Sequence, residues 1–263
     1  IAAETLGYRI SFLIGGAMLA FGFFLVLFLV RETNEMPGGG EAPSAPPAER
    51  PRSTTGKPSV RSRLALFLTI PMLSLFALIL VLRFVRALPI PFLPLYVQEL
   101  RGQLTGSASA TGIISAGRGA VTALAAITIV RLGDRYPRIL LVGILLGIGG
   151  VFSIPLFFSP SLGFFAIFIL ASTFFLGGVE PLVQADLSSR IPPARRGLLF
   201  GIQTSIANIG WFAAPIVGTF VSIRWGLAHV FLTLTFFLFI TATSVIVTFF
   251  RRNREASGAR RAV

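Results

Sequence analysis

The chain has 263 residues, of which 54% are hydrophobic and only 13% are charged. A soluble domain carries about 25% charged residues, so this composition indicates an integral membrane protein. There is no cysteine, one histidine (His229) and one lysine (Lys57), which excludes disulfides, zinc clusters and a Walker-type phosphate loop, and we expect neither an enzyme nor a cofactor or metal.

The net charge of +13 does not indicate a nucleic-acid partner. The charges lie in clusters between apolar runs rather than along one face. Positive charge beside hydrophobic segments is typical of cytoplasmic loops that face anionic lipid. The lipid bilayer is therefore the expected partner.

Seven apolar stretches are long enough to cross a membrane, because a span needs about 20 residues. They cover residues 10–30, 71–97, 106–130, 139–158, 162–183, 198–221 and 227–250. The first lacks a basic leader and a cleavage site, so we interpret it as a true span rather than a signal peptide. Three prolines (Pro89, Pro91 and Pro94) should bend the outer end of the second. The predicted fold class is an all-α membrane protein with seven transmembrane helices.

Orientation follows from the arginine and lysine residues of the connecting segments. Most of the 23 lie in four segments: residues 31–64, the loops after the third and fifth spans, and the C-terminal tail. The alternate segments hold only Arg9, Arg101 and Arg224. Because cytoplasmic segments are enriched in these residues, we expect the N-terminus outside and the C-terminus inside.

The sequence also predicts a division of the chain. Residues 1–30 form one helix, 31–63 a disordered cytoplasmic linker, 64–250 a six-helix bundle and 251–263 a basic cytoplasmic tail. The linker is rich in proline and glycine and poor in large apolar residues, so it cannot offset the entropy of ordering. We interpret it as a tether, with a regulatory role as the alternative.

Ionisable side chains inside the spans predict which helices face water. Arg83 and Arg86 lie in the second span, Arg118 in the third and Glu180 in the fifth, while Gln203 and Asn208 lie in the sixth. An arginine at mid-membrane costs about 2.5–3.5 kcal/mol, so such residues usually face a bundle interior or a watery cavity. We therefore expect the second, third, fifth and sixth spans to line a polar cavity, with the others as outer supports.

Within this cavity Glu180 is the nearest plausible counter-charge for Arg118, either as a coupling pair or as a structural ion pair. Arg83 and Arg86 are three residues apart and share a helix face. The spans around the cavity hold three arginines but one glutamate, so part of the positive charge has no partner. We expect carboxylates from outside the chain or an anionic substrate to balance it.

Further polar and small residues have more than one interpretation. Gln184, Gln203, Asn208 and Trp211 could contact substrate through hydrogen bonds and ring stacking, or simply pack. Small residues at helical-turn spacing predict close helix contacts. They are Gly112, Ala116, Ala120 and Ala123 in the third span, Gly143 and Gly147 in the fourth, and Gly210, Ala214 and Gly218 in the sixth.

Two short loops resemble those of the major facilitator superfamily. Arg131-Leu-Gly-Asp-Arg-Tyr-Pro-Arg138 resembles the family's signature between helices eight and nine, keeping Gly133, Asp134, Arg135 and Arg138 but with Pro137 where glycine is usual. Residues 192–197 resemble the loop between helices ten and eleven. Ala213-Ala-Pro-Ile-Val-Gly218, which contains Pro215, is similar to the Gly-Pro-x-x-Gly element of drug exporters, and residues 91–96 resemble the outer end of helix seven.

This resemblance implies that the seven spans are helices six to twelve, so that residues 1–30 are the last helix of the N-terminal half and the linker at 31–63 is the central loop that joins the two halves. It also implies that helices seven, eight, ten and eleven surround the cavity. It implies alternating access by rocking of two halves. Asp134 and Arg135 would close the cytoplasmic side, the Asp gaining from a helix N-terminus; the alternative is an ordinary basic turn.

The pattern looks most like twelve-helix exporters that exchange drugs for protons across the inner membrane. The alternative is a carrier for one small organic solute, such as an organic anion. A seven-helix receptor is remote, because the spans hold no lysine and the chain no cysteine. The start at Ile1 without Met leads us to expect that the N-terminal half is missing.

Overall fold

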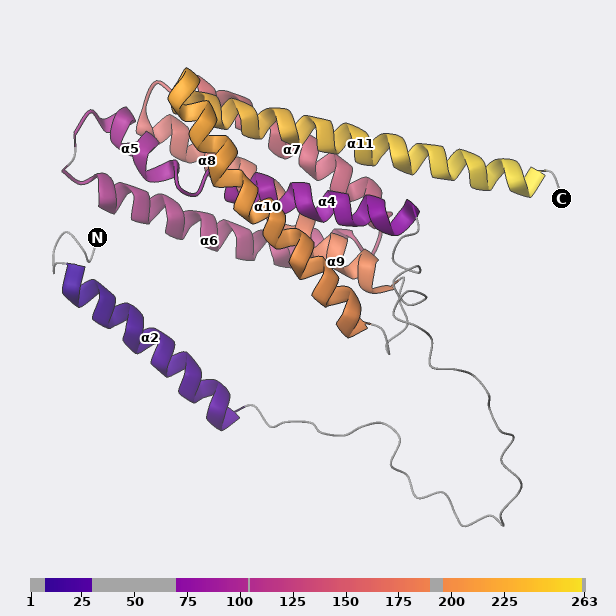
Figure 1. Ribbon diagram of the computed structural model, residues 1–263, viewed down its shortest axis with the longest axis horizontal. Helices are drawn as coiled ribbons and strands as arrows, with labels where there is room; N and C mark the ends of the chain where they lie inside the picture. The colour runs from indigo at the N-terminus through magenta and orange to yellow at the C-terminus, as the bar shows by residue number, and fades with distance from the viewer. Residues whose placement is uncertain (1–7, 30–69, 104, 190–195, 262–263) are drawn as a thin grey trace, which may run out of the picture. The chain divides into compact units, whose positions relative to one another are not determined.

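The computed structural model describes residues 8–29, 70–103, 105–189 and 196–261, and their regular structure is entirely helical (Figure 1). They divide into two units, which we describe separately. The smaller contains helix α2 (Tyr8–Leu29), which matches the first predicted span. The predicted linker at 31–63 and the loop resemblance at residues 192–195 lie outside the described residues.

The larger unit is a bundle of helices that follows the predicted spans closely. Its elements are α4 (Ile70–Ala87), α5 (Leu93–Arg101), α6 (Ser107–Leu132), α7 (Arg138–Phe157), α8 (Leu162–Gly177), α9 (Val179–Ser189), α10 (Arg196–Trp225) and α11 (Ala228–Arg261). Helix α11 continues through most of the basic segment that the sequence set apart as a tail.

Five of the predicted spans are long and apolar enough to cross a membrane. They are Ser107–Leu132, Arg138–Phe157, Leu162–Ser189, Gly197–Trp225 and Ala228–Arg251. The first predicted span corresponds to a shorter apolar helix, Phe12–Phe28, and the second is divided between α4 and α5. The count of seven and the orientation of the termini therefore stay predictions.

The division of the second span occurs where its prolines predict a bend. Helix α4 ends at Ala87, turns follow, and α5 begins at Leu93. Pro89 and Pro91 have no N–H and cannot continue the helical hydrogen-bond ladder, whereas Pro94 lies in the first turn of α5, where proline is tolerated.

The short helix α5 is fixed to the bundle through Tyr96. The hydroxyl of Tyr96 donates a hydrogen bond to the carbonyl oxygen of Leu156 at 3.1 Å. Its ring lies 5.1 Å from that of Phe165 and 4.9 Å from that of Phe231. All three rings are buried, so α5 is held against α7, α8 and α11.

The fifth predicted span is also interrupted, at a position where no break is predicted from the sequence. Helix α8 ends at Gly177 and α9 begins at Val179, with Gly178 between them. A Cβ atom on Gly178 would lie 2.4 Å from the Cγ2 atom of Ile129, and one on Gly177 would lie 2.9 Å from the Cβ atom of Ala125. Glycine is needed at both positions because α6 approaches here, and the break places Glu180 in the first turn of α9.

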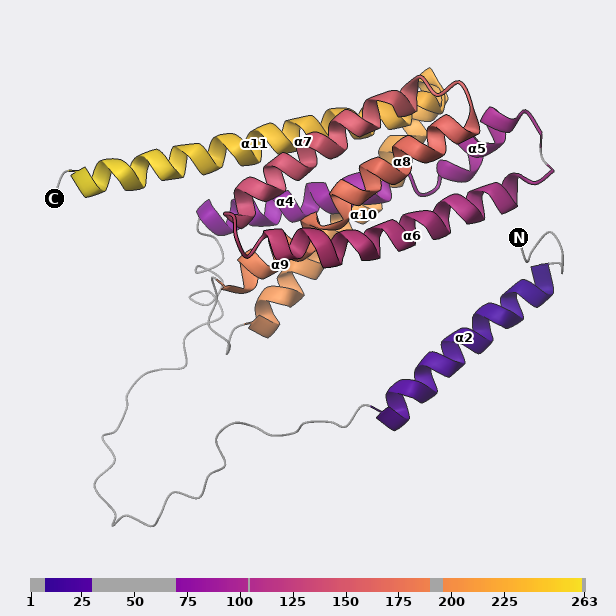
Figure 2. The same ribbon diagram turned by 180° about the vertical axis from the view of Figure 1, so that it is seen from behind.

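Helix α7 packs along α11, α10 crosses α4, and α6 runs beside α8 (Figures 1 and 2). On α10 the predicted small residues lie close to α4 and to the turn that follows it. A Cβ atom on Gly210 would lie 2.3 Å from the carbonyl oxygen of Leu80, and one on Gly218 would lie 2.3 Å from the Cε2 atom of Phe92. Ala214, between them, is fully buried. Gly143 of α7 is similarly close to Ile246 of α11.

The small-residue prediction is wrong for α6 within the described residues. Its four predicted members, Gly112, Ala116, Ala120 and Ala123, are exposed rather than packed. Helix α6 contacts α8 through an adjacent face, where a Cβ atom on Gly117 would lie 3.1 Å from Leu170. Spacing identifies a stripe on a helix, but not the neighbour that covers it.

Candidate functional site

A polar cavity of about 370 Å³ lies within the larger unit. Its polar lining comes from α4, α6, α8 and α9, with Trp211 added by α10: Arg83, Arg86, Ser115, Arg118, Thr122, Ser172, Thr173 and Glu180. Helices α7 and α11 contribute only Leu156 and Leu234. The polarity of the spans therefore agrees with the lining from α4, α6, α8 and α9, whereas α10 contributes a single residue to this cavity.

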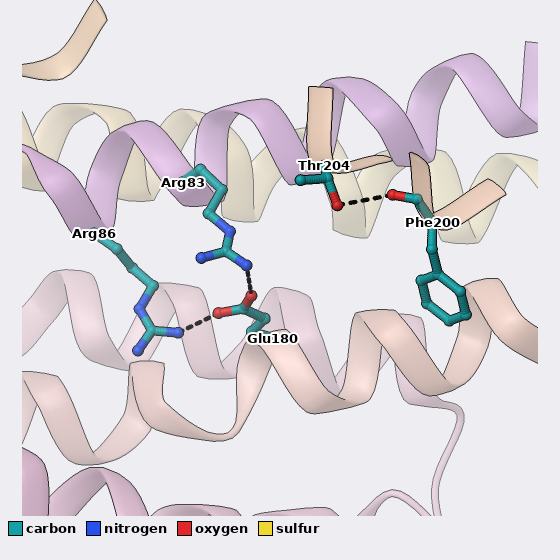
Figure 3. A network of polar contacts seen from close by, with 5 residues as sticks. All are labelled: Arg83, Arg86, Glu180, Phe200 and Thr204. Carbon is teal, nitrogen blue, oxygen red and sulfur yellow. Dashed lines mark hydrogen bonds and ion pairs between the residues drawn. The ribbon is translucent and has the colours of Figure 1, made fainter. Parts of the chain in front are cut away.

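The centre of the site is an ion-pair cluster that joins α4 to α9. The Nη2 atom of Arg83 pairs with one carboxylate oxygen of Glu180, and the Nη1 atom of Arg86 donates to the other (Figure 3). The two arginines reach the same carboxylate because residues three apart lie on one helix face. The Glu180 side chain is only 22% exposed. Its position in the first turn of α9 adds a favourable interaction with the helix dipole.

The expected pairing of Arg118 with Glu180 is wrong. Both residues line the cavity, but both carboxylate oxygens of Glu180 are taken by the arginines of α4. The Nε atom of Arg118 instead donates to the Oγ1 atom of Thr173 at 3.4 Å. Position along a span does not reveal that the face of α9 carrying Glu180 meets α4. Among the residues that line this cavity, three arginines therefore face one carboxylate.

The hydroxyl groups of the cavity were not singled out from the sequence. Thr122, Ser172 and Thr173 donate to the carbonyl oxygens of Arg118, Gly149 and Ile169, respectively. These donors are already used within the bundle. The charged side chains and the hydroxyl of Ser115 are therefore the groups with capacity for an incoming ligand. In the described part of the chain, no cluster of three or more His, Cys, Asp or Glu residues could hold a metal ion.

A second cavity of about 360 Å³ brings together the four predicted substrate-contact residues. Gln184, Gln203, Asn208 and Trp211 line it with Arg83, Phe200, Thr204 and Ala207. The hydroxyl of Thr204 donates to the carbonyl of Phe200 within α10 at 2.8 Å (Figure 3). Arg83 and Trp211 line both cavities, so the second adjoins the ion-pair cluster. Contact between a substrate and the four predicted residues stays a prediction.

Gln203 is the most buried polar residue of this group, at 6% exposure. Its Oε1 atom has no hydrogen-bond partner among the described residues. A small pocket beside it is also lined by Arg83, Arg86, Glu180 and Gln184. A buried amide oxygen without a partner costs about 1–3 kcal/mol. Gln203 therefore holds an unused acceptor next to two guanidinium groups.

The loop between α6 and α7 is attached to the helix that carries Glu180. A Cβ atom on Gly133 would lie 2.3 Å from the Cδ2 atom of Leu182, so α9 packs directly on this turn. The Nη1 atom of Arg138 donates to the carbonyl of Ala185 at 3.4 Å. Asp134 and Arg135 are exposed.

The expected helix-dipole interaction of Asp134 is wrong. Asp134 precedes the first residue of α7 by four positions, whereas the dipole acts within the first turn. Its Oδ1 atom lies 3.9 Å from the Nη2 atom of Arg138 instead. The Asp134 side chain is 73% exposed and that of Arg138 is half-buried, so solvent screens this long pair and it contributes little to stability.

Comparison with known proteins adds independent evidence. The chain is 27% identical over 260 residues to the multidrug resistance protein MdtG of Klebsiella pneumoniae, covering 97% of the chain and 58% of that relative. It is 28% identical over 251 residues to MdtG of Dickeya zeae, covering 94% and 56%. It is 28% identical over 239 residues to MdtG of Escherichia coli, covering 88% and 53%.

The chain thus spans about half the length of these curated relatives. The model of the family described as the Major Facilitator Superfamily matches residues 75–263, which is most of the chain. Together with the apolar helices, this match makes the protein a multi-pass membrane protein of a transporter family, and it removes the receptor alternative. The chain belongs to the Major Facilitator Superfamily.

Proposed function

We propose that this chain forms the C-terminal half of a proton-coupled exporter of small lipophilic molecules in the inner membrane, working by alternating access. The family match supports transport, and the relatives' name, multidrug resistance protein, supports export of drugs. The expected N-terminal half is supported by the chain's coverage of just over half of each relative. The positive-inside bias supports an N-terminus outside and a C-terminus inside.

The observation that carries the proposal is one carboxylate shared by two arginines inside a polar cavity. Ionised Glu180 holds Arg83 and Arg86 on the face of α4. Protonation would remove its charge and leave both guanidinium groups unpaired in a partly buried site. The cluster would then have two arrangements that differ by one proton, which is what coupling to a proton gradient requires.

The loop signature fits the same proposal as a gate on the cytoplasmic side. Gly133 and Arg138 fasten the turn between α6 and α7 to Leu182 and Ala185 of α9. Glu180 lies in the first turn of that helix. We propose that a shift of α9 on protonation reaches the loop through these contacts, while the exposed Asp134 and Arg135 meet the N-terminal half.

Efflux would be tested with this chain joined to its N-terminal half in energised cells. We expect lower accumulation of ethidium and similar lipophilic dyes, abolished by a protonophore. Glu180→Gln should abolish the protonophore-sensitive part because the glutamine cannot ionise. Glu99→Gln is the matched control, since Glu99 is an exposed carboxylate on α5. Unchanged dye accumulation in cells with normal protein levels would contradict drug efflux.

A carrier for a small organic anion is the second candidate, and one observation favours it. Three arginines and one glutamate leave the first cavity with an excess of two positive charges. A carboxylate or phosphonate on the substrate could pair with them. Protection of cells against toxic organic anions, without any effect on cationic dyes, would favour this alternative over export of lipophilic cations.

A further inference from the structure

A groove of about 240 Å³ lies between α4 and α11, away from both polar cavities. Its walls are mainly apolar, including Leu75, Leu78 and Val81 of α4 and Val245 of α11. Ile139, the second residue of α7, also lines it. No residue of this groove lines the polar cavity that holds Glu180. It therefore calls for a separate explanation.

Two of the four hydroxyl side chains that line the groove already donate hydrogen bonds within their own helix. The hydroxyl of Thr241 donates to the carbonyl oxygen of Phe237 at 2.6 Å, and that of Thr248 donates to the carbonyl oxygen of Ser244 at 2.7 Å. These donors are satisfied within α11. Ser74 and Ser244 carry the other two hydroxyl groups, and the remaining seven of the eleven lining residues are apolar, so the groove suits a mainly apolar and narrow occupant such as an acyl chain.

One end of the groove leads to exposed positive charge. Helix α11 continues beyond Phe250 to Arg261, extending past the start of α4 (Figures 1 and 2). Arg251 and Arg254 are exposed there. Ser244 and Thr248 line the groove, and Arg251 follows them at helical spacing, so it lies one turn beyond on the same side.

We propose that the groove and this arginine-bearing turn form a binding site for an anionic phospholipid. One acyl chain lies between α4 and α11, and the headgroup phosphate pairs with Arg251 and Arg254. The acyl chain alone gives little preference, because the bilayer interior is as apolar as the groove. Selectivity therefore comes from charge complementarity at the headgroup, and each arginine near the surface should raise affinity for an anionic lipid about fivefold.

The test is native mass spectrometry of the transporter, containing this chain and its N-terminal half, with equal amounts of phosphatidylglycerol and phosphatidylcholine. We expect preferential retention of phosphatidylglycerol, reduced about fivefold by Arg251→Gln. Arg224→Gln is the matched control, since Arg224 is exposed in the last turn of α10 and does not line the groove. Ala77→Phe, at an exposed position of the groove, should reduce retention of both lipids by filling it.

Equal retention of the two lipids, or equal losses in Arg251→Gln and Arg224→Gln, would overturn the proposal. Retention unaffected by Ala77→Phe would overturn the placement of the acyl chain. A dimer mass that disappears in Ala77→Phe would instead identify a second copy of the chain as the occupant. None of these outcomes depends on whether the protein exports drugs.

Discussion

Gly210 is the position where adding a single methyl group should disturb helix packing most. A Cβ atom there would lie 2.3 Å from the carbonyl oxygen of Leu80 and 3.1 Å from the backbone nitrogen of Phe84. Both neighbours are backbone atoms, so no side chain can rotate away. Gly210→Ala must therefore move α10 and α4 apart by about 1 Å, and overpacking of this kind costs about 1–3 kcal/mol.

The helix propensity of alanine, about 1 kcal/mol better than glycine, offsets part of that cost. The remainder is centred on a net loss of about 1 kcal/mol, which lowers the thermal midpoint by roughly 2–4 °C for a domain of this size. The control is Gly201→Ala on the same helix, where a Cβ atom would meet nothing within 4 Å. It should keep or raise the midpoint.

Thermal unfolding in detergent, followed by the fluorescence of the adjacent Trp211, provides the assay. Arg83 lies between Leu80 and Phe84 on α4, so Gly210→Ala should also displace the ion-pair cluster and lower transport. A midpoint for Gly210→Ala equal to that of the wild type would refute the reasoning. Equal destabilisation by Gly201→Ala would refute it as well, because the effect would then not come from the helix contact.

Three further predictions concern charge and topology. Glu180→Gln should lower the free energy of unfolding by about 1–2 kcal/mol, less than the loss of a fully buried pair. In a double-mutant thermal cycle, adding Arg86→Gln should recover part of that loss. Additive effects of the two substitutions would argue against coupling between the residues. Arg118→Gln should impair transport at normal expression, measured by dye efflux, and full activity would remove Arg118 from the mechanism. The chain has no native cysteine, so single cysteines can report on topology. Tyr136→Cys should react with impermeant maleimide only in inverted vesicles, and Gln103→Cys only in intact cells. The reverse pattern would invert the predicted topology.

Much of the fold follows from composition along the chain. Apolar length alone placed the helices, because a membrane admits few alternatives to a helix. The proline pattern located the interruption between α4 and α5, since proline removes a donor from the ladder. Charge inside apolar spans identified the helices around the cavity, because a buried arginine needs a polar environment.

The details of the site were less accessible, because sequence position gives depth along a helix but not the rotation of its neighbours. Depth along the spans offered Glu180 as a partner for Arg118, yet Glu180 pairs with the arginines of α4. The missing information is the break at Gly178, which separates α9 from α8. Its signal is the Gly177-Gly178 pair beside Glu180, which a search for close helix contacts could have found.

The turns between α4 and α5 lie at an end of α4 that is held to the bundle. Tyr96 anchors the outer piece to the bundle, so a swing of α4 would pivot near Leu88. At 1.5 Å per residue, Arg83 lies roughly 7 Å from that pivot and Leu73 roughly 22 Å. A rotation that moves the far end of α4 therefore carries Arg83 only about a third as far. An ion pair this close to the pivot would persist through a rotation of α4 that would break an ion pair at the other end of the helix.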